Sequence, residues 1–135
     1  MNEKNLKPVS VFYYFEEICK VPRPSKREEK IIAYLKAFGR EHGLETKTDE
    51  VGNVLIKKPA TPGKENLKTV ILQSHIDMVC EKNSDVEHDF LIDPIDTVVD
   101  GEWLKAKGTT LGADNGIGVA TELAILAATD IEHGP

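Results

Sequence analysis

A histidine and an aspartate, His75 and Asp77, follow a short run of apolar or β-branched residues, 69–72, within the stretch TVILQSHIDMV. The run predicts a short buried strand. Because residues two apart in an extended chain point to the same side, we expect the imidazole and the carboxylate to lie side by side. Open α/β sheets place their sites at the carboxyl ends of strands, so the pair is a candidate for chemistry. The plain alternative is a buried histidine satisfied by its neighbouring aspartate.

A second unusual stretch, GTTLGADNGIG at 108–118, contains four glycines that bracket one carboxylate, Asp114. Glycine allows unusual backbone dihedrals and close approach of other groups. A phosphate-binding loop is one interpretation, but the stretch has neither G-x-x-x-x-G-K-[ST] nor a G-x-G-x-x-G that follows a strand. The other interpretation is that the loop presents Asp114 to the same site as His75 and Asp77.

A histidine combined with carboxylates suits zinc. A carboxylate that bridges two metals about 3.5–4 Å apart is a recurrent device of hydrolases. Two ligands do not complete a catalytic zinc site, which normally has three protein ligands and a water. A rival mechanism uses Cys80 as a nucleophile with His75 or His88 as its base. The plain alternative for Cys80 is a small buried hydrophobic residue.

Three helices and two pairs of strands are expected to position these residues. Helical spacing of apolar residues predicts the helices, and alternation predicts the strands. Ser25 and Glu28 have the spacing of a capping box at the start of the second helix. The acidic, irregular stretch between the central strand and Trp103 is expected to be a long loop with one short strand. The predicted helices are 8–20, 26–42 and 117–129, and the predicted strands are 44–50, 53–58, 69–72 and 103–107.

The composition of the 135 residues fits one ordinary globular domain, with 40% hydrophobic and 30% charged residues. The net charge of −6 argues against nucleic acid as a partner, since nucleic acid requires a basic footprint. No stretch approaches the length of a membrane span, and the polar start of the chain has no signal-peptide core. The two cysteines are interpreted as reduced thiols, and the expected location is cytoplasmic.

The motifs SHIDMVCEKN, HDF with DPI, and GEWLKAKGTTLGADNGIGVA together resemble the start of the aminoacyl-histidine dipeptidases. This is the Xaa-His dipeptidase branch of the M20 metallopeptidases. The resemblance covers the whole chain, to the HGP at its end. More distant members share the His-x-Asp but have a different, Lys-Gly-containing sequence around the second aspartate, so the glycine-rich stretch points to the dipeptidase branch.

The resemblance implies a role for each candidate residue. His75 would be a ligand of one zinc, and Asp114 would bridge two zincs, which are the implied cofactors. Asp77 would be the catalytic carboxylate that orients His75 and raises its basicity. The peptide bond between Asp114 and Asn115 would be cis. The implied activity is hydrolysis of a small peptide, preferentially an Xaa-His dipeptide, by water that the zincs activate.

The resemblance also implies a fold and an extent. The fold would be α/β, with a sheet flanked by helices as in zinc-dependent exopeptidases. Residues 1–135 would be the amino-terminal part of one catalytic domain. The family's Glu-Glu pair after HGP, a further carboxylate, a final histidine and the lid or dimerisation domain have no counterpart here, so this segment alone is expected to be inactive. A homodimeric parent is allowed by the resemblance. A non-catalytic binding or structural domain that keeps the fold is the alternative function.

Overall fold

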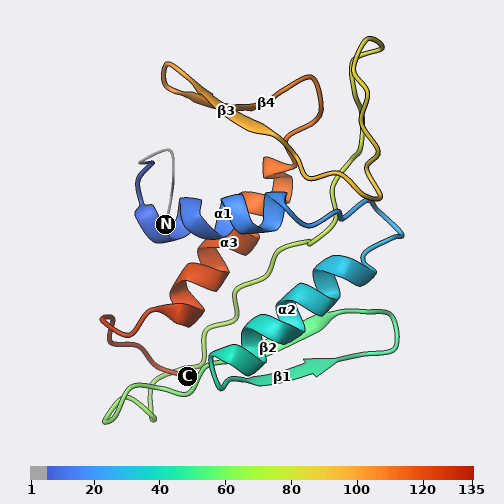
Figure 1. The fold of residues 1–135 in the computed structure, drawn as a ribbon. Coiled ribbons are helices and arrows are strands. Elements are labelled where there is room, and N and C mark those ends of the chain that lie inside the picture. Colours follow the sequence, from blue (N-terminus) through green and yellow to red (C-terminus); the bar gives the residue numbers. More distant parts are fainter. Residues whose placement is uncertain (1–5) are drawn as a thin grey trace.

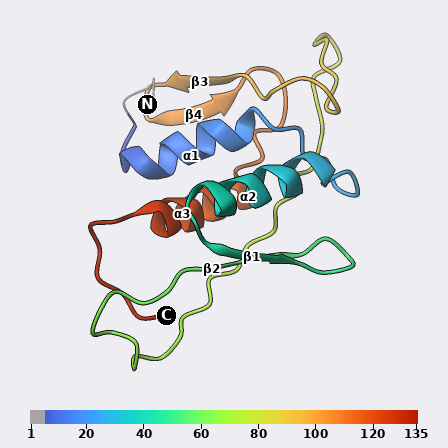
Figure 2. The same cartoon turned by 60° about the horizontal axis from the view of Figure 1, so that its bottom comes forward.

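The computed structural model describes residues 6–135. Helices and strands alternate in the described part, with the helices lying between two small hairpins (Figures 1 and 2). None of the described helices has the length and apolar character needed to cross a bilayer. In chain order the elements are α1 (Val9–Cys19), α2 (Glu29–Glu41), β1 (Glu45–Thr48), β2 (Val54–Lys57), β3 (Thr97–Asp100), β4 (Trp103–Ala106) and α3 (Ala113–Ala127).

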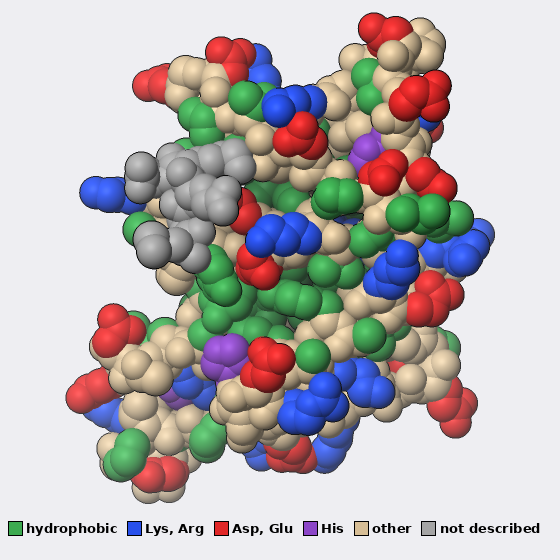
Figure 3. Space-filling model, viewed as in Figure 1, with side chains coloured by type: hydrophobic (Ala, Val, Ile, Leu, Met, Phe, Trp, Pro, Cys, Tyr) green, Lys and Arg blue, Asp and Glu red, His purple; other side chains and the backbone are tan. Residues whose placement is uncertain are grey.

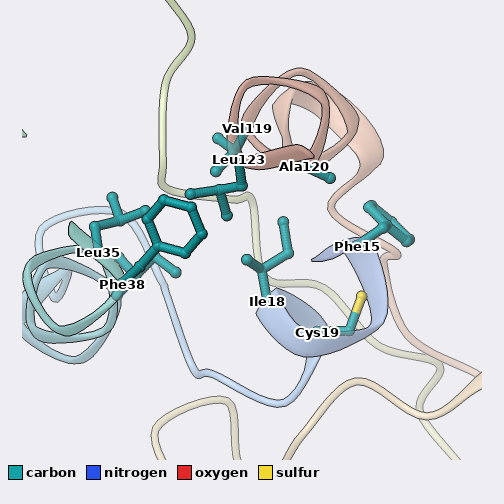
Figure 4. Close-up of a cluster of buried hydrophobic side chains, with 9 residues drawn as sticks. Phe15, Ile18, Cys19, Leu35, Phe38, Val119, Ala120 and Leu123 are labelled. Atoms are coloured by element: carbon teal, nitrogen blue, oxygen red, sulfur yellow. The ribbon is translucent and has the colours of Figure 1, made fainter. Parts of the chain in front are cut away.

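The core is formed where the apolar faces of the three helices meet (Figure 4). On α1, Phe15 and Ile18 are each 1% exposed, as their spacing of three residues on a helix requires. Side chains of α2 approach from one side and those of α3 from the other. This packing fixes α3, and with it the glycine-rich stretch at its start. The cluster comprises Phe15, Ile18, Cys19, Ile31, Leu35, Phe38, Val119, Ala120 and Leu123.

The strands form two separate antiparallel hairpins. In the first, Glu45 pairs with Lys57 and Thr48 with Val54, which confirms the predicted hairpin with shorter strands. In the second, β3 pairs with β4, and β3 is the short strand that was expected inside the long loop. Helix α2 packs on the first hairpin. Together these elements give the mixed α/β character that the sequence predicted.

The predicted buried strand at 69–72 is wrong for the described residues. This stretch is extended without a strand ladder (Figure 1), and the side chains of Val70 and Ile71 are 70% and 81% exposed. A strand needs a neighbour for its backbone groups. Here a single backbone bond, from the Val70 N–H to the Pro135 carbonyl at 3.0 Å, joins the stretch to residues at the other end of the chain. Apolar composition correctly indicated an extended segment but not its burial.

The predicted capping box at Ser25 and Glu28 is also wrong. Helix α2 begins at Glu29, with Glu28 as its N-cap and no side-chain cap. The Glu28 carboxylate instead accepts a hydrogen bond from the Lys26 N–H at 2.7 Å. The Ser25 hydroxyl donates to the carboxylate of Asp77. A hydrogen bond to a charged acceptor is stronger than one to a neutral group, which explains why the serine is engaged there.

Candidate active site

The imidazole of His75 lies between two carboxylates. Its Nδ1 is 3.0 Å from Oδ1 of Asp77, and its Nε2 is 3.0 Å from Oδ1 of Asp114. The first contact follows from the spacing of two residues along an extended segment. The second joins parts of the chain that are 39 positions apart. The three predicted site residues therefore converge, even though the segment that carries the first two is not part of a sheet.

The carboxylate of Asp77 is held through both of its oxygens. Oδ1 faces His75, and Oδ2 accepts the hydrogen bond from Ser25. The hydrogen bond from Ser25, followed by the one from His75, holds the pKa of Asp77 below its usual range. An ionised Asp77 can accept the N–H at Nδ1 of His75 and thereby leave Nε2 as the atom that faces Asp114.

Asp114 is placed at an interruption of the start of α3. Gly112 precedes it with a left-handed φ of 72°, and both Asp114 and Asn115 have non-helical backbone angles. The Asp114–Asn115 peptide bond is cis, as the family resemblance implied. The Asn115 side-chain oxygen accepts a hydrogen bond from the N–H of Gly118 at 3.2 Å. This local structure directs the Asp114 carboxylate away from the helix, where it is 97% exposed.

The electrostatics of His75 reflect its two neighbours. The hydrogen bond to Asp114 is the main cause that raises the pKa of His75, and the contacts with Asp77 add to it. A neutral imidazole has only one N–H, so two facing carboxylates are both satisfied only when the ring is protonated or when a cation replaces the second proton. The pair of His75 Nε2 and Asp114 Oδ1 is thus a donor set that fits a divalent metal such as zinc.

The ligand set within the described segment is partial. Among residues 6–135, no group of three or more histidine, cysteine, aspartate or glutamate side chains is arranged to hold a metal ion. Catalytic zinc normally has three protein ligands. His75 and Asp114 could therefore hold a zinc only together with further ligands.

A cleft of about 350 Å³ lies beside the site. His75 and Asp77 form part of its wall, and the opposite wall comes from the start of α2 and from the turn before β2. Its polar lining includes Glu28 and Asn53. Space next to the imidazole is what a small substrate would require.

Sequence reasoning missed Arg23 and Ser25, which it assigned only to a helix break and a cap. Arg23 is 2% exposed, and its Nη2 donates to the Gly112 carbonyl at 2.7 Å. Desolvation by burial lowers the pKa of the Arg23 guanidinium. A single arginine between two prolines gives no local signal of such a role, because the contacts span more than 50 positions.

The rival nucleophile, Cys80, lies in a poor environment for a thiolate. Its Sγ is 3.7 Å from the Met78 carbonyl, and burial raises the pKa of the thiol. Reactive cysteines have lowered pKa values, because the thiolate is the nucleophile. The His88 ring packs against Phe90, with ring centroids 4.5 Å apart. The structure therefore favours the histidine and carboxylate site over the thiol.

Comparison with known proteins places this geometry in a family context. The chain is 52% identical over 130 residues to the cytosol non-specific dipeptidase of Escherichia coli K12, covering 96% of this chain and 27% of that protein. The crystal structure of aminoacylhistidine dipeptidase from Vibrio alginolyticus matches with a TM-score of 0.94 and 54% identity, over 97% of this chain and 27% of that one. Over this segment, the chain is a relative of the aminoacyl-histidine dipeptidases. The resemblance inferred from the motifs is confirmed.

Two more distant solved structures share the fold. A tripeptidase from Staphylococcus aureus and the aminopeptidase PepT from Bacillus cereus each match with a TM-score of 0.72 and 23% identity over 93% of this chain. They confirm the α/β peptidase-like fold of the segment. No protein-family model matches the chain. The chain spans about a quarter of the length of its dipeptidase relatives, with 27% of each covered.

Proposed function

We propose that the whole protein is a zinc-dependent dipeptidase in which residues 1–135 form the amino-terminal part of the catalytic domain. The observation that carries the proposal is the position of the His75 imidazole between Asp77 and Asp114 at 3.0 Å from each. Supporting it, the segment that holds these residues is more than half identical to two proteins named as dipeptidases.

Each of the three side chains has a separate task in this proposal. His75 and Asp114 hold metal, with Asp114 shared between two zinc ions. Asp77 accepts the N–H at Nδ1 of His75, which fixes the ring and makes Nε2 a better donor to a cation. Zinc bound there supplies Lewis-acid polarisation of the peptide carbonyl and lowers the pKa of a water molecule. The high exposure of the Asp114 carboxylate, 97%, leaves room for both metal and substrate.

The expected substrate is a dipeptide, with preference for histidine at its carboxyl end. The names of the two relatives differ on this point, since one is a non-specific dipeptidase and the other an aminoacylhistidine dipeptidase. Preference for Xaa-His is thus the finer part of the proposal. A cytoplasmic location is also proposed, supported by the word cytosol in the name of one relative. A homodimeric assembly stays a prediction.

The test is an assay of the whole protein with dipeptides that share an amino-terminal residue and differ at the carboxyl end. Zinc-loaded protein is compared with protein stripped by a chelator and with stripped protein to which zinc has been returned. We expect hydrolysis that is lost on stripping, restored by zinc and fastest for Xaa-His. Equal rates for all dipeptides would overturn the Xaa-His preference. Absence of hydrolysis at saturating zinc would favour the non-catalytic binding or structural domain.

A further inference from the structure

The segment Arg23–Ser25 runs beside the residues that carry His75 and Asp77. The Met78 N–H donates to the Arg23 carbonyl at 3.0 Å, and Pro24 pairs with Met78 in a parallel bridge. This register brings Ser25 level with Asp77. The two prolines around Arg23 restrict the backbone, so the position of the segment is fixed locally as well as by its contacts.

The side chain of Arg23 joins the two parts of the chain that form the site. Its Nη2 donates to the carbonyl of Gly112, two residues before Asp114, at 2.7 Å. Its Nη1 lies 3.4 Å from the carbonyls of Ile76 and Asp77. A guanidinium has a planar fork of donors, which allows one side chain to bind both backbones at a fixed separation.

The glycines of the second motif make room for this guanidinium. A Cβ atom at Gly112 would lie 2.6 Å from Arg23 Nη2, and one at Gly116 would lie 2.7 Å from the same atom. A buried charge is costly, and apolar packing of similar volume is often as stabilising. A cation that is 2% exposed and surrounded by glycines is therefore a costly way to fill space, which argues for a geometric task.

Ser25 acts on the other side of the site, and it is exposed. Its hydroxyl donates to Oδ2 of Asp77, while Oδ1 of the same carboxylate faces His75. The two contacts together fix the rotation of the carboxylate. Because Ser25 is outside the core, loss of its hydroxyl opens no cavity, and any effect of removing it on the site is separable from an effect on folding.

We propose that Arg23 and Ser25 are positioning residues of the site: Arg23 sets the separation between the His75–Asp77 segment and the Asp114 loop, and Ser25 sets the orientation of the Asp77 carboxylate. The inference rests on the proposed dipeptidase function. Neither residue touches the reacting atoms in this proposal. Both act through groups that hold or orient the metal ligands, where loss of a partner typically costs about 10–100-fold in metal affinity or activity.

The first test compares Ser25→Ala with Ser25→Thr in the whole protein, and uses Ser84→Ala, at another exposed serine, as a control. Zinc affinity is measured by chelator competition, and kcat and KM are measured at saturating zinc. We expect Ser25→Ala to lower zinc affinity or kcat about tenfold or more, with little change in KM. Ser25→Thr, which keeps the hydroxyl, should restore both. Values near wild type for Ser25→Ala would overturn the role of Ser25.

The second test uses Arg23→Lys, which keeps the charge but has one nitrogen to serve both backbones. Ile31→Val, in the core at 0% exposure, is the control for a loss of stability alone. We expect Arg23→Lys to lower kcat about tenfold or more in protein that is folded by circular dichroism, whereas Ile31→Val lowers thermal stability and leaves kcat unchanged. A kcat that falls only in proportion to stability in both variants would overturn the role of Arg23.

Crystal structures of metal-free wild-type and Ser25→Ala protein separate this inference from the proposed function. We expect the contact between His75 Nδ1 and Asp77 Oδ1 to be present in the wild type and lost or rotated in the variant. If the wild type neither binds zinc nor hydrolyses dipeptides, the proposed function fails, and this structural comparison still decides whether Ser25 positions Asp77. An unchanged Asp77 carboxylate in the variant would contradict the inference.

Discussion

Nε2 of His75 lies 3.0 Å from Oδ1 of Asp114, across a separation of 39 positions in the chain. This contact joins the two unusual motifs of the sequence, the His-x-Asp stretch and the glycine-rich stretch, into one site. The other ring nitrogen of His75 faces Asp77 at the same distance, so the imidazole is held at both ends. The predictions below follow from this arrangement.

Replacing Asp114 with Asn should lower the pKa of His75 in metal-free protein, because the hydrogen bond to Asp114 is the main cause of its elevation. A raised pKa means that the folded protein holds the proton more tightly than the unfolded chain does. The resulting stabilisation is complete below the ordinary histidine pKa of 6.5 and is lost as pH rises through the raised value. NMR titration of the imidazole measures the shift, with Asp85→Asn as a control at an exposed carboxylate. A His75 pKa that is the same in all three proteins would contradict the contact.

Replacing Gly112 with Ala should destabilise the protein more than the same change at Gly63. Both glycines have a positive φ, 72° and 86°, so both substitutions carry the backbone cost of about 1–2 kcal/mol. Gly63 has open space around its Cβ position, whereas a Cβ at Gly112 would lie 2.6 Å from Arg23 Nη2 and 2.7 Å from Met78 Sδ. Overpacking of this kind costs about 1–3 kcal/mol more. Urea unfolding of the two variants measures the difference, and equal losses would show that the guanidinium does not crowd Gly112.

Replacing Cys80 with Ser should leave dipeptide hydrolysis by the whole protein close to the wild-type rate. Burial raises the pKa of the Cys80 thiol, so little thiolate is present near neutral pH. Alkylation with iodoacetamide should likewise be slow at this position. Loss of turnover in the serine variant, with zinc content unchanged, would revive the thiol mechanism.

Residues 1–135 purified alone should bind zinc more weakly than the whole protein and should not hydrolyse Xaa-His dipeptides. His75 and Asp114 leave each zinc short of the three protein ligands of a catalytic site. Absence of a general base by itself costs about 10²–10⁴-fold in rate. Circular dichroism first establishes that the segment is folded, and both proteins are then assayed at saturating zinc. Turnover within about tenfold of the whole protein would show that the general base lies inside the segment.

The parts of the structure that the sequence predicted are those governed by local periodicity. Helical spacing located α1 and α2, alternation located the first hairpin, and a spacing of two residues placed the side chains of His75 and Asp77 together. The strand predicted at 69–72 fails because pairing depends on a neighbouring strand, and apolar composition carries no information about one. The Ser25 contact with Asp77 was missed for a related reason, since it joins residues 52 positions apart.

The role of the glycines shows the same limit. Their number around Asp114 was recognisable, and it correctly indicated close approach by another group. The identity of that group, the Arg23 guanidinium at Gly112 and Gly116, depends on tertiary packing between α1 and α3. Sequence reasoning could thus locate the site but not the arginine that joins its two parts.

The most direct test of the account is the zinc content of the whole protein, measured per chain by mass spectrometry in wild type, His75→Ala, Asp114→Ala and the control Asp85→Ala. If Asp114 bridges two zincs, its loss should lower occupancy of both, whereas loss of His75 should mainly empty one. The control should retain the wild-type content, because Asp85 lies in the exposed loop away from the His75–Asp114 contact. Zinc content in Asp114→Ala equal to that of the wild type would contradict the proposed metal site.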